Sequence, residues 1–354
     1  MSQYSQLKQV LQEQLNWHGA RISFLALFLL ALLKVKTVNL KDLCLGFGGR
    51  ALPESSYQRL QRFFGEFELD YAQLAHLVVS WMQIRGNWVL SLDRTTWKFG
   101  THWYNILTLG IVYQGVAFPI LWWMLDKQGN SNSDERMRFM ETFAKRFPSA
   151  QVHYLCADRE FIGQAWVRYL LLEPTLAFRL RIRSSDAIEH DGKVLTARVV
   201  FAHLQPGQSQ PLIGTCRVWG SPVAVEALRL DDGNVLVVIA PVGTQNLVSD
   251  YALRWGIETL FGIFKTRGFC LESTHFTDSE RLSKLFALLT LALCWAMRTG
   301  LWLHQWQPIE IKKHGRRAKS LFRLGLDYLR HLVLNPSSSN ESDFVQSLQL
   351  LSCT

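Results

Sequence analysis

Four polar residues between positions 251 and 265 are spaced so that one α-helix would bring them onto a single side. Relative to Glu258, and at about 100° per residue, Tyr251 lies at about +20°, Arg254 at about −40° and Lys265 at about −20°. The apolar residues fall on the opposite, buried face; they are Leu253, Ile257, Leu260 and Phe264. A carboxylate flanked by two cations and a phenol suits phosphate chemistry. The alternative is a solvated surface with an Arg254–Glu258 pair worth only a few tenths of a kcal/mol.

Two aspartates farther upstream each follow a short hydrophobic run with strand character. Asp93 lies in VLSLDRTTWKFG after Trp88–Leu92, and Asp158 lies in HYLCADREFIG after Gln151–Ala157. Open α/β sheets present their chemistry at the carboxyl ends of strands, although an aspartate there is commonly only a turn or cap residue. Two acids at strand ends and Glu258 on a half-buried helix predict one site with three carboxylates.

These motifs resemble those of insertion-sequence family four, a large family of bacterial DDE transposases. The spacing Tyr-x2-Arg-x3-Glu-x6-Lys from Tyr251 matches the family's Y-R-E-K signature. D-R-T-x-W at Asp93 resembles its first aspartate motif, and D-R-E at Asp158 resembles its second. The resemblance is strong over residues 87–270, whereas the first 85 residues and the tail match only in general character. It implies a ribonuclease-H-like domain whose catalytic residues are Asp93, Asp158 and Glu258.

The resemblance also implies metal-dependent cleavage of phosphodiesters. Two Mg²⁺ ions about 3.5–4 Å apart, which Mn²⁺ can replace, activate a water or a DNA 3′-hydroxyl and stabilise the departing oxygen. Such hard cations take oxygen ligands. In the family's arrangement Asp93 bridges the two metals, Asp158 binds one and Glu258 binds the other. Glu160 is near enough in sequence to compete with Asp158, but we expect it to start the following helix.

Four further residues are expected to contact DNA. Arg254 and Lys265 would hold phosphates near the cleavage point, and Tyr251 would bond a phosphate oxygen or stack on a sugar or base. Trp219, beside the turn at Gly220–Pro222, is a candidate to stack on an extruded base near the transposon end. The alternative for Trp219 is an ordinary core or surface position.

The elements that must position these residues follow a mixed α/β order, with three strands, a helix, a strand, a helix and a strand. The strands are predicted at Trp88–Leu92, Ile106–Val112, Val116–Trp123, Gln151–Ala157 and Thr175–Ile182, and the helices over about 134–147 and 161–173. A β-rich insertion follows, with strand candidates at Arg198–His203, Gly214–Trp219, Val223–Arg229 and Val235–Pro241. Other helices are expected over about 22–34, 54–64, 70–84 and 279–303.

The chain is therefore predicted to be an α/β protein with four regions. These are a helical N-terminal DNA-binding region (1–85), a ribonuclease-H-like catalytic domain (86–183 and 246–303), a β-rich insertion (184–245) and a basic helical tail (304–354). In the first region, Arg59 and Arg62 either lie on DNA or are ordinary surface charges. The tail begins with a basic run around Lys312, and we expect its Ser/Asn-rich part at Asn335–Ser342 to be flexible.

Composition bounds the choice of partner and compartment. With 354 residues, 48% of them apolar and 13 Trp, the chain can form two or three folded domains and is not disordered. A net charge of +9 and a pI of about 9.3 favour a polyanion, nucleic acid first. Scattered cysteines without a C-x-x-C pair argue against structural zinc and for the cytoplasm. The apolar runs Phe24–Leu33 and Phe286–Met297 are too short to cross a bilayer, so no membrane partner is expected.

The predicted function is a cut-and-paste DNA transposase of the bacterial cytoplasm, associated with the nucleoid when bound to DNA. It would act on double-stranded DNA, at terminal inverted repeats and at a target, and the resemblance implies a homodimer in the DNA complex. One alternative is a metal nuclease of the same fold without strand transfer, and another is a DNA-binding regulator with an inactive triad. A retaining glycosidase also uses paired carboxylates, but the cation-flanked helix and the basic balance suit phosphates better.

Overall fold

The computed structural model describes residues 1–48, 51–172, 176–313 and 315–352, so the predicted strand start at Thr175 lies outside the described residues. The chain divides into two compact units. The helical unit comprises Met1–Ile84, Trp97–His102 and Phe261–Thr354, and the sheet unit comprises Arg85–Thr96 and Trp103–Leu260. The division into four regions made from the sequence stays a prediction.

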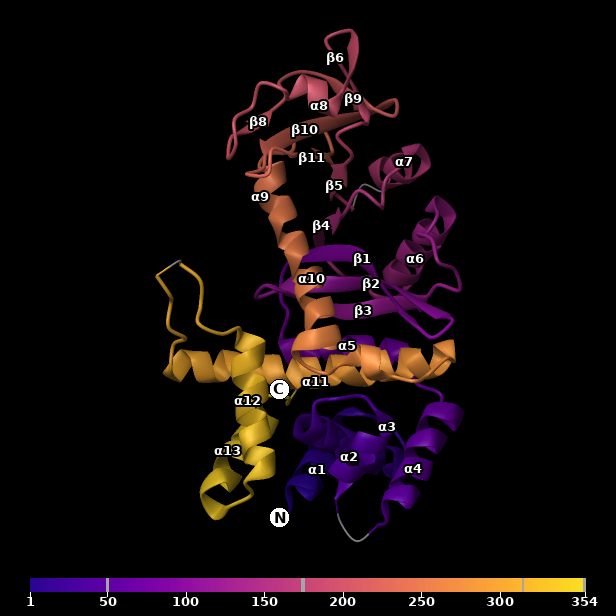
Figure 1. Cartoon of the computed structure of the whole chain (residues 1–354), viewed down its shortest axis with the longest axis vertical. Coiled ribbons are helices and arrows are strands. Elements are labelled where there is room, and N and C mark those ends of the chain that lie inside the picture. The colour runs from indigo at the N-terminus through magenta and orange to yellow at the C-terminus, as the bar shows by residue number, and fades with distance from the viewer. Residues whose placement is uncertain (49–50, 173–175, 314, 353–354) are drawn as a thin grey trace. The chain divides into compact units, whose positions relative to one another are not determined.

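The sheet unit is built on one mixed sheet (Figure 1). Its strands are β1 (Trp88–Phe99), β2 (His102–Tyr113), β3 (Val116–Met124), β4 (Val152–Ala157), β5 (Phe178–Ile182), β6 (Ala187–His190), β7 (Lys193–Thr196), β8 (Ser209–Pro211), β9 (Cys216–Val218), β10 (Ser221–Arg229) and β11 (Val235–Ala240). Within the described residues the order is β3-β2-β1-β4-β5-β11-β10-β9-β6-β7, and β8 pairs with β10. β4 is parallel to both β1 and β5, so three neighbouring strands end at the same edge.

The β-rich insertion continues this sheet. β11 pairs antiparallel with β5, Val237 opposite Ile182, and β10 then pairs with β11. The predicted strand at Arg198–His203 is wrong: Thr196 is the N-cap of a short helix, α8 (Ala197–Val200), and a turn follows. The β6–β7 hairpin, which the sequence prediction lacks, turns at Asp191 and Gly192, whose φ angles of 49° and 74° suit a tight two-residue hairpin turn.

The helices of the sheet unit are α6 (Ser133–Arg146), α7 (Gln164–Leu172), α8, α9 (Leu247–Tyr251) and α10 (Trp255–Gly262). α6 begins with a capping box, in which Asn132 and Glu135 each accept a hydrogen bond from the other's backbone N–H. α7 begins at Gln164, later than predicted, because Gly163 with φ of 129° and the turn before it separate it from β4.

The stretch Tyr251–Lys265 is not one regular α-helix, contrary to the prediction. α9 ends at Tyr251, a 3₁₀ turn covers Ala252–Arg254, α10 follows, and a π-helical turn covers Ile263–Arg267. Leu253, predicted on the buried face, is 45% exposed, whereas Ile257 and Leu260 are fully buried. Tighter and wider turns change the angle per residue, so a fixed 100° step misplaces residues at both ends.

The helical unit contains the remaining helices. They are α1 (Gln3–Gln14), α2 (Gly19–Val35), α3 (Leu40–Phe47), α4 (Pro53–Glu66), α5 (Tyr71–Met82), α11 (Ser279–Trp306), α12 (Leu321–Leu334) and α13 (Ser338–Gln349). α11 and α12 cross closely (Figure 1), and a Cβ on Gly300 would lie 2.0 Å from the carbonyl oxygen of Leu321. α13 begins at Ser338, so the expectation of a flexible Asn335–Ser342 segment is wrong for most of it.

One described helix, α11, is long and apolar enough to cross a membrane by length and composition, and the bent pair α2–α3 passes the same test if it is counted as one span. The apolar window of α11 is 83% buried within the protein. This burial is what a core helix shows, although α11 is longer than the apolar run Phe286–Met297 that was judged too short to cross a bilayer.

Candidate active site

Strand register brings the two aspartates together. β1 and β4 pair in parallel up to Leu92, which lies opposite Ala157, so Asp93 and Asp158 are the next residues on neighbouring strands. Neighbouring strands lie about 4.8 Å apart. The predicted strand end at Leu92 is where pairing with β4 ends, although β1 itself continues to Phe99.

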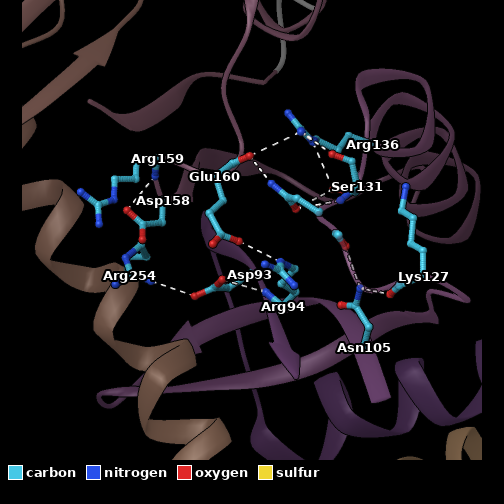
Figure 2. Close-up of polar contacts among 12 residues, drawn as sticks. Asp93, Arg94, Asn105, Lys127, Ser131, Arg136, Asp158, Arg159, Glu160 and Arg254 are labelled. Carbon is cyan, nitrogen blue, oxygen red and sulfur yellow. Dashed lines mark hydrogen bonds and ion pairs between the residues drawn. The ribbon is translucent and has the colours of Figure 1, made fainter. Parts of the chain in front are cut away.

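Arg254 links Asp93 to the third carboxylate. Its Nη1 donates to Asp93 Oδ2 at 2.8 Å (Figure 2) and to Glu258 Oε1 at 3.2 Å, and its Nη2 reaches the same Glu258 oxygen at 3.3 Å. Both oxygens bond to the same nitrogen, so the distance between Asp93 Oδ2 and Glu258 Oε1 cannot exceed the sum of these two bond lengths. The Arg254 side chain is only 7% exposed, and its Nε is buried without a hydrogen-bond partner among the described residues.

Asp158 is held by its own surroundings beside this pair. Its Oδ1 accepts from the backbone N–H of Arg159 at 2.7 Å (Figure 2) and from the hydroxyl of Tyr251 at 3.3 Å. Arg181 on β5 approaches the same oxygen at 3.6 Å. β1, β4, β5 and the α9–α10 segment thus all contribute side chains to one place, and the predicted convergence of Asp93, Asp158 and Glu258 is consistent with this geometry.

The environment of Asp93 raises the pKa of its carboxyl to about 7. Burial is the main cause; the Arg254 guanidinium and the Arg94 backbone N–H oppose it, and the negative charges of Glu258 and Asp158 add to it. The pKa of Arg254 is raised: burial works against its charged form, but Tyr251 and the three carboxylates outweigh burial.

This raised pKa predicts a pH dependence of stability. Between the ordinary value of 3.8 and about 7, folded Asp93 keeps a proton that the unfolded chain has released. The stabilisation is therefore complete below pH 3.8 and is lost as the pH rises towards 7. With a chelator present, we expect the free energy of unfolding of wild type to fall relative to that of Asp93→Asn as the pH rises through this range. The change is at most about 1.4 kcal/mol per pH unit. Urea unfolding of both proteins at pH 4.5, 5.5, 6.5 and 7.5 measures it; a constant difference would contradict it.

Glu160, the alternative to Asp158, has another partner. Its carboxylate pairs with Arg94 Nε at 2.8 Å, and its backbone carbonyl accepts from Asn130 and Arg136 (Figure 2). It does not start the following helix as expected, because α7 begins only at Gln164. This geometry favours Asp158 as the second acid.

A partly buried ion pair holds the start of the segment that carries Tyr251, Arg254 and Glu258. Arg179 on β5 donates twice to Asp250 Oδ2, from Nε at 2.9 Å and from Nη2 at 2.7 Å. Its guanidinium also lies 4.5 Å from the centre of the Tyr154 ring on β4. We call Arg179, Asp250 and Tyr154 the α9 clamp, because they fasten the first turn of α9 to two central strands.

α10 is held close to the β2–β3 hairpin by a glycine. A Cβ on Gly256 would lie 3.0 Å from Val112 Cγ1, 3.2 Å from the backbone nitrogen of Ala117 and 3.3 Å from the carbonyl carbon of Val116. Two of these three neighbours are backbone atoms that cannot rotate away. Glycine at position 256 therefore allows the helical turn that carries Glu258 to pack close to the β2–β3 hairpin.

Two other residues predicted to contact DNA have local surroundings of their own. Lys265 belongs to the helical unit, where its Nζ pairs with Glu272 at 3.1 Å and lies 5.3 Å from the centre of the Trp97 ring. Trp219 is half-buried and has φ of 49° in the β9–β10 turn.

Sequence reasoning missed several residues of this site. Arg94 and Arg181 each lie against a carboxylate, and Trp255, directly after Arg254, is 66% exposed. One signal was present: the run Arg179-Leu-Arg-Ile-Arg183 places arginines at alternate positions of a strand, on one face of the sheet.

The donor set suits a hard divalent cation. Carboxylate oxygens from separate elements are the ligands such ions take, and among the described residues the desolvated carboxyl of Asp93 forms an ion pair only with Arg254. Within the described ranges, no group of three or more His, Cys, Asp or Glu side chains is close enough to hold a metal as it stands. In this structure the Arg254 guanidinium supplies the positive charge between Asp93 and Glu258.

Comparison with known proteins places this chain in a family. The fold resembles a piggyBac transposase whose synaptic complex with hairpin DNA was solved by cryo-electron microscopy, with a TM-score of 0.51, 11% identity, and coverage of 96% of this chain and 77% of that chain. This likeness agrees with the predicted fold class. No curated protein matches the chain. The family model described as the transposase DDE domain matches residues 84–295, which is more than half of the sequence, and the chain therefore belongs to the DDE-domain transposase family.

Proposed function

We propose that this protein is a DNA transposase of insertion-sequence family four, which cuts at transposon ends and joins them to target DNA. The observation that carries the proposal is the arrangement of Asp93 and Asp158 side by side on parallel strands, with Glu258 bound to Asp93 through Arg254. Family membership and the Y-R-E-K spacing support it.

Asp93, Asp158 and Glu258 would hold the divalent metal, two Mg²⁺ or Mn²⁺ ions on the resemblance. The metal would supply an activated water or 3′-hydroxyl and a counter-charge for the departing oxygen. The low exposure of Asp93 and Arg254, at 13% and 7%, excludes water and strengthens electrostatic interactions within the site.

The remaining residues of the segment would bind the DNA backbone. Among the described residues the buried Nε of Arg254 has no hydrogen-bond partner, and a phosphate oxygen could draw Nη1 away from Asp93 and Nη2 away from Glu258. Lys265 would exchange Glu272 for a phosphate, and the Tyr251 hydroxyl lies beside Asp158. Trp219, which lies in the β9–β10 turn, and the exposed Trp255 each offer a ring on which a base could stack.

The substrate is double-stranded DNA that bears both element ends, bound by two copies of the chain. The piggyBac relative was solved as a synaptic complex with hairpin DNA, and a chemistry that joins two ends requires them to be held together. The net charge of +9 agrees with a polyanionic substrate.

The experiment uses purified protein, a plasmid that carries the DNA flanking both sides of the gene, and a second plasmid as target. With Mg²⁺ or Mn²⁺ we expect an excised element and joined product DNA, and with chelator neither. Cleavage without joined product would identify a metal nuclease. Binding without cleavage in either metal would identify a regulator. Both outcomes contradict the proposal.

A further inference from the structure

An arginine occupies a core position of helix α6. The buried side of this helix is formed by Arg136, Phe139, Met140 and Phe143, which recur at intervals of three or four residues. Arg136 is 5% exposed, and within the part of the chain that the structure describes it forms no ion pair. Arginine is seldom buried without a carboxylate partner, because it is costly to take its charge out of water. Other contacts have to offset this cost.

The Arg136 guanidinium binds two loops at once (Figure 2). In the segment before α6, its Nε donates to the Ser131 hydroxyl at 3.1 Å and its Nη2 donates to the Ser131 carbonyl. In the loop after Asp158, its Nη1 donates to the Ile162 carbonyl at 3.1 Å and its Nη2 donates to the Glu160 carbonyl at 3.4 Å. Because the guanidinium is planar and rigid, these bonds hold the two loops in one relative position.

Two asparagines strengthen the same connection. Asn130 donates from Nδ2 to the Glu160 carbonyl, which therefore accepts from two side chains. Asn105, a buried residue of β2, donates from Nδ2 to the carbonyls of Lys127 and Gly129 at 2.8 Å each. The segment before α6 is thus attached to a strand of the catalytic sheet, and the loop after β4 is attached to that segment.

This loop determines how the Asp158 carboxylate is oriented. The backbone N–H of Phe161 donates to the Asp158 carbonyl at 2.8 Å, which closes a turn over four residues. Within the turn, the N–H of Arg159 donates to Asp158 Oδ1 at 2.7 Å. The Phe161 side chain is fully buried, and the Arg136 guanidinium lies 5.5 Å from the centre of its ring. Arg136 therefore holds the turn from the side opposite to the carboxylate, through backbone carbonyls and a ring.

We infer that Arg136 is a positioning residue for the metal site, which holds the turn at Asp158 in the orientation in which this carboxylate binds a divalent ion. The inference rests on the proposed function and extends it to a residue that contacts none of the three acids. Residues that orient a metal ligand commonly change the metal affinity by about 10- to 100-fold when they are replaced. An arginine with a purely structural role would change the stability of the fold and leave the metal affinity of the folded protein unchanged.

The test measures the binding of Mn²⁺ alone to the full-length chain, followed by the electron paramagnetic resonance signal of free Mn²⁺. Asp158→Asn gives the background of binding elsewhere. Arg136→Lys retains the charge but loses the planar set of donors, so we expect its dissociation constant for Mn²⁺ to rise about 10- to 100-fold. The Mn²⁺ concentration that half-saturates cleavage of a plasmid with both element ends should rise by the same factor, and saturating Mn²⁺ should recover most of the rate.

Arg146→Lys is the matched control. Arg146 lies on the same helix and donates from Nη1 to a carbonyl at 3.0 Å, but that carbonyl belongs to Ile120 on β3. This variant should keep the wild-type affinity for Mn²⁺. If Arg136→Lys does not fold, Asn130→Ala replaces it, because it removes the other donor to the Glu160 carbonyl. Asn130→Ala should weaken Mn²⁺ binding in the same direction and by a smaller factor.

The possible outcomes separate the inference from the proposed function. Wild-type Mn²⁺ affinity in Arg136→Lys, with a lowered melting temperature, would show a purely structural role and overturn the inference. An equal loss of affinity in Arg136→Lys and Arg146→Lys, or slower cleavage with unchanged half-saturation, would also overturn it. Wild-type protein that cleaves equally well in chelator, or whose Mn²⁺ binding matches that of Asp158→Asn, would instead count against the proposed function.

Discussion

Replacement of Asp93 by asparagine is expected to abolish DNA cleavage and to leave DNA binding within a few-fold of wild type. The amide has the shape of the carboxylate but lacks its charge, so it is a poor ligand for a divalent ion. Removing a group on which the whole site depends commonly costs roughly 10³-fold or more. Binding should survive because most affinity for DNA comes from cations that contact phosphates. Gel assays of cleavage and anisotropy measurements of binding separate the two effects.

The same assay distinguishes the neighbouring acids. Asp158→Asn should match Asp93→Asn, whereas Glu160→Gln should retain most cleavage, because the Glu160 carboxylate is engaged with Arg94. Asp231→Asn, at an exposed position in the β10–β11 turn, is the matched control and should cleave like wild type. Cleavage by Asp93→Asn at the control rate would show that Asp93 holds no metal.

Removal of Arg179 is expected to destabilise the fold by about 3 kcal/mol, the low end of the range for a fully buried ion pair, because Asp250 is 27% exposed. Arg179 is 5% exposed and donates two hydrogen bonds to Asp250, so Arg179→Ala leaves a largely buried carboxylate without its counter-ion. The contact of the guanidinium with the Tyr154 ring is lost as well. Urea unfolding at pH 7 measures the change in free energy.

A second variant tests the cause. Arg179→Met/Asp250→Leu removes both charges and retains apolar volume, so it should recover much of the lost stability. A loss below about 1 kcal/mol for Arg179→Ala would mean that the pair behaves like an exposed ion pair and that the α9 clamp does not fasten the helix.

Local sequence patterns were sufficient to predict the strands that precede Asp93 and Asp158 and to identify these two aspartates as site residues. Asp93 and Asp158 could be found because each follows a hydrophobic strand, and parallel strands that share an edge leave such residues adjacent. The β6–β7 hairpin was also within reach, since Asp191–Gly192 is a strong signal for a two-residue turn. The run at Arg198–His203 has β-branched residues, yet one helical turn starts at Ala197. Over so few residues, neighbouring structure outweighs intrinsic preference.

The links between distant residues could not be predicted from spacing. A pair between Arg254 and Glu258, four residues apart, was the alternative to a phosphate contact, but the shorter bond of Arg254 goes to Asp93, which lies on another element. The 3₁₀ and π turns that flank α10 depend on packing, so a helical wheel placed Leu253 and Lys265 by a rule that the backbone does not follow there. The α9 clamp likewise joins β5 to a helix across the whole insertion.

The pairing of β5 with β11 has a consequence for synthesis on the ribosome. β5 ends at Ile182, but the strand that covers its free side begins only at Val235, after most of the insertion has been translated. Until then the nascent chain presents an uncovered hydrophobic strand edge, which other chains can join. Translation speed through the insertion, and chaperones that shield that edge, should therefore govern how much active protein a cell recovers. Slowing the codons between β5 and β11 should lower the soluble yield more than slowing those after α10.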